Sequence, residues 1–581
     1  MKTRLFRWAV TGLMALPPSI PRSAEKIPHL CGTCLDAVAP PASEQKDPPP
    51  STQKSAGLPL DSWAWECVPS VIRADQTESF ILEVEVGTGT AVSNIVLDFQ
   101  GYSLAGPAPG LMEMRDDGLP PDREADDQIY SAGPWTTGPL YSLPPHYNSI
   151  SSGIDQVAFL SLGSVTLTRS DASTETFLSW PLIGILSTNV PAIPSHRIGE
   201  NHVVTPHLIN VRGDRRDTQR FLHRVGLSKI QCISKPIYDV LPNNYDFLNF
   251  FSVDRVERIP RLDSRNFVRG KHLTTFADFT GTRFLPTDVT AIYGGAGRLL
   301  GLNVVDVGSR GLSSDNLCHE ILHQWSAYLP PGSPLASGSH YNLRTSAASL
   351  LGGYRWDDDG MGNFVFNCNE GRNGATEASP LDKYFMGLIP GSNVPPQYAI
   401  TDTSIPFNSL CGNVVTHAYE VVTVDDIQAV YGVRTPGPDT AQRRFNMGFI
   451  AESFDRFLNE TELTFFDRFA AYVTGSIPSN APTPYMGGNW EPIERYFGEN
   501  TIWSSAVGAV LDIERTGSNQ VDVNVGNLAL EGDFRLQETA DLLAPTWSDR
   551  TGPAPTPPGH QTRIVISNAP ARGYLRALQE R

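Results

Sequence analysis

Short runs of apolar residues, bounded by turn-forming residues, dominate the first third of the chain. The runs at 80–86 (FILEVEV), 94–99 (NIVLDF) and 156–169 (QVAFLSLGSVTLTR) are separated by segments rich in Gly, Pro and Asp. Apolar runs of about four to eight residues between turn signals are typical of strands. Several such strands in succession predict a β-sandwich, which we place at residues 60–200.

A more mixed pattern follows at 201–527. The segment 299–307 (LLGLNVVDV) resembles a buried strand. At 462–473 (ELTFFDRFAAYV) the apolar residues recur at intervals of three and four, which predicts a helix with one buried face. The segment ends at the strand-like run 521–525 (VDVNV). This mixture predicts an α+β domain over 201–527.

The two ends of the chain differ from the middle. Residues 1–24 begin with basic residues followed by the apolar run WAVTGLMAL, which predicts a secretory signal peptide and a secreted, extracellular protein. Residues 25–59 are rich in Pro, Ser and Ala, which favours an extended linker. Residues 528–581 resemble the small C-terminal β modules of some exported bacterial proteins, so we expect a β module there.

Composition narrows the possible partners. Charged residues make up only 18% of the chain, while Gly (50) and Pro (47) are abundant, which predicts more strand than helix. The formal net charge of −17 would repel nucleic acid. No apolar run reaches the roughly 18 residues that a transmembrane helix needs. We therefore expect no nucleic-acid partner and no transmembrane segment.

Seven cysteines are few and odd in number for this length. In an exported protein they allow up to three disulfides, whose pairing cannot be read from sequence. Cys31 and Cys34 have the CxxC spacing of redox and zinc motifs, but they lie alone in the Pro-rich tail. A local disulfide or free thiols is the favoured interpretation for this pair.

The segment 317–325 (LCHEILHQW) carries the strongest chemical signal. His319, Glu320 and His323 form HExxH in a chain with only twelve histidines. On a helix the two histidines project from one face, so they can bind one ion together, with the glutamate beside them. The polar residues SSDN before the motif provide N-cap side chains, and two prolines after it stop the helix. The sequence therefore predicts a metal-binding helix.

This motif resembles that of the zincin metallopeptidases. The stretch from about Tyr245 to Leu388 resembles a less characterised secreted bacterial HExxH family, in which a GSHW-like segment and an SPLDxYxMGL segment follow the motif. The present chain has SGSHYN at 337–342 and SPLDKYFMGL at 379–388. The resemblance implies a zincin-like α+β catalytic domain, zinc as cofactor, a protein or peptide substrate and peptide-bond hydrolysis.

Catalytic zinc takes three protein ligands and water, so a third ligand is needed. The extended motif HExxHxxGxxH is absent, because no histidine follows His323 until His340. His340 is the first choice, since a neutral imidazole in a turn bounded by Gly and Ser suits zinc. Asp382 is second and Glu377 third. An exposed loop histidine is the alternative interpretation of His340.

In the mechanism that the resemblance implies, the ion polarises the scissile carbonyl and activates water, and Glu320 transfers the proton to the leaving amine. Tyr384 is a candidate oxyanion donor only because it lies in the SPLDKYFMGL segment. Met386 could form the floor of the metal site, although a Met in an apolar run is more often core.

Two Asp-rich loops could hold structural calcium. Residues 111–131 (LMEMRDDGLPPDREADDQIYS) resemble a loop of β-sandwich modules in secreted bacterial proteins. Residues 356–364 (WDDDGMGNF) offer Asp357, Asp359 and Asn363. In both loops, hydrogen bonds from turn amides to Asp side chains explain the same composition, and we favour that interpretation.

The sequence is compatible with two functions. The first is a secreted zinc metallopeptidase with Glu320 as general base and His319, His323 and His340 as ligands. The second is a secreted or cell-surface adhesion or glycan-binding protein whose HExxH domain is catalytically idle. In either case the β modules could contact glycans or a cell surface.

Overall fold

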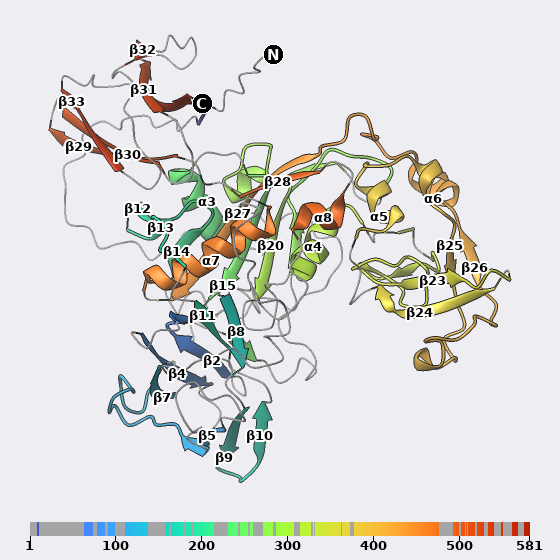
Figure 1. Cartoon of the computed structure of the whole chain (residues 1–581), viewed down its shortest axis with the longest axis horizontal. Helices are drawn as coiled ribbons and strands as arrows, with labels where there is room; N and C mark the ends of the chain where they lie inside the picture. Colours follow the sequence, from blue (N-terminus) through green and yellow to red (C-terminus); the bar gives the residue numbers. More distant parts are fainter. Residues whose placement is uncertain are drawn as a thin grey trace.

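A mixed sheet of eight strands forms the centre of the described part of the protein (Figure 1). The edge strand β17 and the pair β12–β13 are antiparallel to their neighbours, whereas the four strands between them are parallel. In sheet order the strands are β12 (His196–Ile198), β13 (His202–Val204), β14 (Ile209–Gly213), β27 (Arg444–Phe454), β15 (Phe247–Ser252), β20 (Gly301–Asp306) and β17 (Lys271–Thr274), and β28 (Ile502–Ser504) pairs with β27.

This computed structural model describes the chain in segments. Those segments are residues 9–10, 63–73, 78–87, 91–98, 111–136, 157–161, 164–177, 182–186, 190–198, 200–213, 230–241, 245–253, 256–258, 271–282, 286–306, 314–326, 329–330, 332–361, 363–371, 377–454, 456–475, 492–498, 501–505, 507, 509–517, 520–527, 533–539, 548–549, 561–567 and 574–580. Apart from β1 (Ala9–Val10), the predicted signal peptide lies outside them, as do the predicted linker at 25–59 and the Cys31–Cys34 pair.

Both faces of the central sheet are covered because its strands alternate apolar side chains between the faces. Phe251 and Phe449 belong to a core shared with α4 (Ser314–Leu322) and α7 (Glu460–Val473). Phe250 and Ile450 face the opposite side and pack with α3 (Ile230–Val240). Complete burial of each Phe or Ile side chain contributes roughly 1.5–3 kcal/mol. The first of these cores packs α4 against the sheet, and the second stabilises the opposite face of the same sheet.

Helix α7 confirms the helix predicted at 462–473. It begins at a capping box in which Asn459 accepts a hydrogen bond from Glu462 N, and the Glu462 carboxylate accepts one from Asn459 N, both at 2.9 Å. The same carboxylate accepts from Ser70 N at 2.7 Å and pairs with Arg456 at 2.6 Å. Glu462 therefore ties the N-terminal sheets to the central sheet.

The N-terminal strands enclose a core of their own, in which Phe80, Ile95 and Leu167 are fully buried. The three sheets in this region are β16 (Val256–Arg258), β2 (Trp63–Val68), β4 (Ser79–Val86) and β7 (Ile129–Thr136); β10 (Thr174–Phe177), β9 (Ser164–Arg169), β5 (Val92–Asp98) and β6 (Leu111–Glu113); and β3 (Val71–Arg73), β11 (Leu182–Leu186) and β8 (Val157–Ser161). Strand β16, from the middle of the sequence, completes the first of them.

The C-terminal segments form two further sheets. Strand β30 pairs with β33, so this pairing joins residues on both sides of position 527. The sheets are β29 (Ala509–Gly517), β30 (Gln520–Asn527) and β33 (Gln561–Ser567), and β1, β34 (Tyr574–Glu580), β31 (Asp533–Thr539) and β32 (Ser548–Asp549).

The remaining elements are short hairpins and helices, several of which form a group to one side of α4 (Figure 1). The hairpins are β18 (Phe276–Ala277) with β19 (Thr287–Asp288), β21 (Ala336–Ser337) with β22 (His340–Tyr341), β23 (Tyr354–Asp358) with β24 (Phe364–Gly371), and β25 (Gln397–Ala399) with β26 (Glu420–Val422). The helices are α5 (Pro380–Phe385), α6 (Val424–Tyr431), α8 (Ile493–Phe497) and the 3₁₀ turns η3 (Thr290–Tyr293), η4 (Gly391–Asn393) and η5 (Phe407–Ser409).

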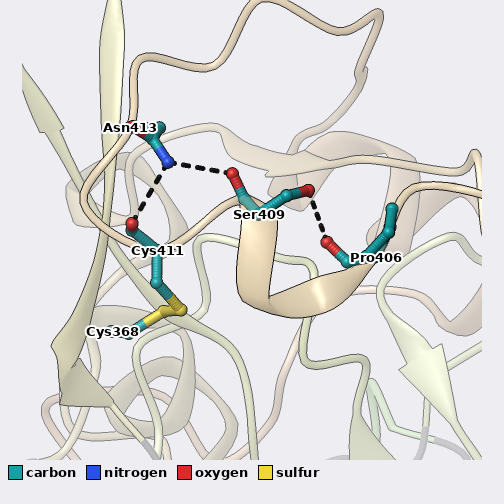
Figure 2. The surroundings of a disulfide bond; sticks show 5 residues. All are labelled: Cys368, Pro406, Ser409, Cys411 and Asn413. Carbon is teal, nitrogen blue, oxygen red and sulfur yellow. Dashed lines mark hydrogen bonds between the residues drawn. A yellow bond between two sulfur atoms is a disulfide. The ribbon is translucent and has the colours of Figure 1, made fainter.

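A disulfide between Cys368 and Cys411 joins β24 to the segment after η5 (Figure 2). Asn413 Nδ2 donates to Ser409 O at 3.0 Å, and Ser409 Oγ donates to Pro406 O at 2.6 Å, so the turn around the disulfide is also hydrogen-bonded. Cys67 and Cys318 are buried.

The predicted α+β zincin-like domain is wrong. The described part of the chain is mostly β, with several sheets, and its six α-helices are short, the longest having 14 residues. The apolar periodicity at 462–473 and in the motif marked real helices, but these are few, because the abundant Gly and Pro limit helix length and most apolar runs pair as strands. The composition-based expectation of more strand than helix is confirmed. Within these residues no helix is long and apolar enough to cross a membrane.

Candidate metal centre

The motif helix α4 positions the first half of the site. Leu317, Ile321 and Leu322 are buried in the core, which directs the opposite face of the helix toward the hairpin β21–β22. The regular helix ends at Leu322, and the next residues continue in tighter turns, with His323 N donating to Glu320 O at 3.2 Å. His323 therefore stays close to His319, with ring centroids 5.1 Å apart.

The hairpin β21–β22 brings the third histidine to the helix. His340 begins strand β22, and its ring centroid lies 5.1 Å from that of His319 and 4.9 Å from that of His323. One ligand nitrogen from each of the three rings lies within 4.8 Å of the others. The structure thus joins His319, His323 and His340 in a group that could hold a metal ion.

A backbone carbonyl sets the tautomer of His319. Its Nδ1 lies 2.9 Å from Leu350 O, which can only accept, so Nδ1 carries the proton and Nε2 presents its lone pair. That Nε2 lies 3.1 Å from His340 Nε2. Outer hydrogen bonds of this kind orient metal-binding imidazoles in proteins.

Burial changes the protonation of two motif residues. Burial first, and then the neighbouring His319 and His340, lower the pKa of His323 to about 2. The His323 imidazole is therefore neutral at pH 7 and has a lone pair for a metal. Burial also raises the pKa of Glu320 to about 8, and the charge of a bound dication would oppose that rise.

A buried polar network behind the site was not anticipated from the sequence. His272 on β17 lies 2.7 Å from Asn303 Oδ1 through Nδ1 and 2.9 Å from Gln324 Oε1 through Nε2. Gln324 Nε2 donates to Phe276 O at 2.8 Å, which fixes the residue after His323 against the sheet edge. Burial lowers the pKa of His272 to about 4. In the sequence, only the polar Gln324 among apolar motif residues indicates such a network. The position of His272 depends on the pairing of β17 with β20, which the sequence does not show.

Gly301 is required by this network. A Cβ at this position would lie 2.4 Å from His272 Cε1 and 3.0 Å from Gln324 Oε1. The glycine in the strand-like run LLGLNVVDV therefore leaves the space that the His272 ring fills.

The structure does not bring the other candidate ligands to the histidines. Asp382 is fully buried at the start of α5, where it accepts hydrogen bonds from Ser379 and from Tyr341. The side chain of Glu377 is 73% exposed and lies 3.6 Å from Lys383 Nζ. Neither carboxylate belongs to the histidine group.

The two other residues considered in the SPLDKYFMGL segment have structural surroundings. The hydroxyl of Tyr384 accepts a hydrogen bond from Gln428 Nε2 of α6 at 3.1 Å, a contact away from the motif helix. Met386 follows α5 and is buried in the core that it shares with α4 and α7. We therefore assign Tyr384 no oxyanion role.

The Asp-rich loops satisfy their own amides. In the first, Asp116, Asp122 and Asp127 bring carboxylate oxygens within 4.8 Å, while Gly118 N donates to Asp122 at 2.6 Å and Gln128 N donates to Asp116 at 3.1 Å. These bonds fit the interpretation that the loop is an Asp-capped turn.

The second loop is also a tight turn. Asp359 accepts from Met361 N at 2.8 Å and from Asn363 Nδ2 at 2.9 Å, and Asp357 pairs with Arg355. The carboxylates of Asp357 and Asp359 therefore bind to groups within the hairpin β23–β24.

Comparison with known proteins adds no family. No protein-family model, curated protein or solved structure matches the chain. Function must therefore be inferred from the three histidines and the residues around them.

Proposed function

We propose that the protein is a zinc-dependent hydrolase, most specifically a metallopeptidase. The observation that carries the proposal is the group of His319, His323 and His340, whose ligand nitrogens lie within 4.8 Å, with the buried Glu320 on the same helix. Three protein ligands leave a fourth position for water or substrate, as catalytic zinc requires.

The donor set fits zinc. Three imidazoles suit zinc better than calcium or magnesium, which prefer oxygen ligands. His323 is neutral because of burial, and His319 presents Nε2 because Nδ1 donates to Leu350 O. When bound, zinc polarises a carbonyl and lowers the pKa of its water to about 7.

Glu320 supplies the proton transfers. It follows the ligand His319 directly and is 5% exposed, so its carboxylate has little competing water. As general base it takes a proton from the attacking water, and as general acid it gives that proton to the leaving amine. Peptide bonds are the proposed substrate class because the amine leaving group needs this second transfer.

We also propose that the enzyme acts outside the cytosol. The basic and apolar N-terminal pattern supports export, and the disulfide between Cys368 and Cys411 suits an oxidising compartment.

Zinc-reconstituted protein should be assayed against a mixed peptide library, with products identified by mass spectrometry. Glu320→Gln should retain zinc and lose about 10²–10⁴-fold in rate, because it removes general acid–base catalysis. The matched control Glu377→Gln changes an exposed glutamate and should keep full activity. Peptide cleavage that survives Glu320→Gln would contradict the proposed role, and zinc binding with no cleavage would favour an adhesion or glycan-binding protein.

A further inference from the structure

The SPLDKYFMGL segment contains a buried carboxylate with two separate sets of contacts. Asp382 has no exposed surface. Its Oδ2 accepts from Ser379 Oγ at 2.8 Å and from Ser379 N at 3.3 Å, which completes the capping box of α5. One carboxylate oxygen is sufficient for this capping role.

The second oxygen reaches the hairpin that carries a metal-centre histidine. Tyr341 donates its hydroxyl proton to Asp382 Oδ1 at 3.1 Å, across 41 positions of sequence. Tyr341 directly follows His340 in β22 and is 1% exposed. The side chain of Ser349 also lies close to the Asp382 carboxylate and opposes the rise of its pKa that burial causes. One carboxylate therefore contacts both β22 and the turn at 349–352.

Both of these segments support the histidine group. Tyr341 N donates to Leu351 O at 2.9 Å, so strand β22 and the turn are also joined through their backbones. The adjacent carbonyl, Leu350 O, accepts from His319 Nδ1. A shift of the turn would rotate the His319 ring, and a shift of β22 would move His340.

We propose that Asp382 is a positioning residue for the metal centre, acting through Tyr341 and the turn at 349–352 to hold His340 and His319 in one arrangement. The inference rests on the metal centre proposed above. Burying a carboxylate is costly unless it accepts several hydrogen bonds, and the contacts of Asp382 beyond its own helix cap are with the two segments that hold the ligands. The SPLD segment thus contributes to the site without binding the metal.

The test uses the full chain reconstituted with cobalt(II), whose visible absorption reports ligand geometry. Tyr341→Phe removes one hydroxyl, and Asp382→Asn removes the charge. Both should weaken cobalt binding by about 10-fold or more and change the visible spectrum, because outer partners of metal ligands contribute on that scale. Tyr384→Phe is the matched control, since it removes a buried hydroxyl of α5 that contacts Gln428 instead.

The outcomes distinguish a positioning role of Asp382 from a role confined to the cap of α5. Tyr341→Phe with wild-type affinity and spectrum would overturn the inference, even if its melting temperature falls, because Asp382 would then serve α5 alone. Tyr341→Phe with weaker binding and an altered spectrum, beside an unchanged Tyr384→Phe, supports it. If Asp382→Asn does not fold, the Tyr341→Phe comparison still decides. Wild-type protein that takes up no cobalt would overturn the metal centre itself. Wild-type protein that binds cobalt, beside an unchanged Tyr341→Phe, would overturn only the positioning role of Asp382.

Discussion

Nε2 of His319 lies 3.1 Å from Nε2 of His340. Two nitrogens bound to one zinc at 2.0–2.1 Å in tetrahedral geometry are about 3.3 Å apart, so this separation is close to that of two ligands of a common ion. The first nitrogen belongs to the motif helix and the second to a hairpin that begins thirteen positions after His323, at Ala336. The site therefore depends on how α4 and β21–β22 are held together.

Gly301→Ala should destabilise the protein and disturb the network behind His323. The new Cβ would lie 2.4 Å from His272 Cε1, so the ring or the strand must move, at a cost of roughly 1–3 kcal/mol. Denaturant unfolding of the zinc-free protein measures this cost. Gly437→Ala is the control, because the nearest atom to its Cβ is 3.9 Å away, and equal stability losses in the two variants would contradict the packing argument.

Glu452→Gln should flatten the dependence of stability on pH. Glu452 is 2% exposed, neither carboxylate oxygen has a hydrogen-bond partner among the described residues, and burial raises its pKa from 4.5 to about 8. A raised folded-state pKa gives stability that is fully present below pH 4.5 and is lost as pH rises toward 8. The loss is about 1.4 kcal/mol per pH unit for one carboxyl group, and Gln cannot ionise.

Urea unfolding of the wild type and of Glu452→Gln at intervals from pH 5 to pH 8 measures this difference. The free energy of unfolding of the wild type should fall more steeply with pH than that of the variant, by the amount that one ionising carboxyl group contributes. Parallel curves would show that the carboxyl group finds a partner or water in solution.

Replacing both cysteines of the disulfide, Cys368→Ser with Cys411→Ser, should lower stability without removing the metal. The bridge closes a loop with a sequence separation of 43, which in the chain-entropy model corresponds to roughly 3–4 kcal/mol. Thermal melting and zinc content of the double variant check both parts. Loss of zinc with unchanged melting would show that the hairpin β23–β24 controls the metal centre instead.

Acid should release the metal in step with protonation of the histidines. Binding requires neutral imidazoles, so protons compete with zinc as pH falls. Burial, together with the neighbouring histidines, lowers the pKa of His323 to about 2, so this ligand stays neutral down to pH 4. Zinc content after dialysis at steps from pH 7 to pH 4 measures the release, and zinc that is fully retained at pH 4 would contradict a site of three imidazoles.

The sequence predicted local features of the site better than the fold around it. HExxH spacing places His319, Glu320 and His323 on one helix turn, because side-chain direction in a helix is a local property. His340 was chosen for its chemistry and the structure brings it to the helix. Asp382 was considered as a ligand, but its hydrogen bonds to Ser379 and Tyr341 place it outside the histidine group.

The fold required information that a single sequence does not carry. The pairings of β14 with β27 and of β27 with β15 join strands more than 190 positions apart, and apolar runs do not state their partners. His272 reaches Gln324 only because β17 pairs with β20. The prediction of an α+β zincin-like fold was wrong because it rested on one short helical motif. Most of the surrounding domain is made of strands.

The proposed function depends on one zinc ion held by His319, His323 and His340. Elemental analysis should be made on purified wild type, on His340→Ala and on His417→Ala, the last being an exposed histidine away from the group. Binding by the three histidines predicts about one zinc per chain in the wild type and in His417→Ala, and a large loss in His340→Ala. Wild-type protein that binds no zinc after reconstitution, or His340→Ala that keeps a full zinc, would contradict it.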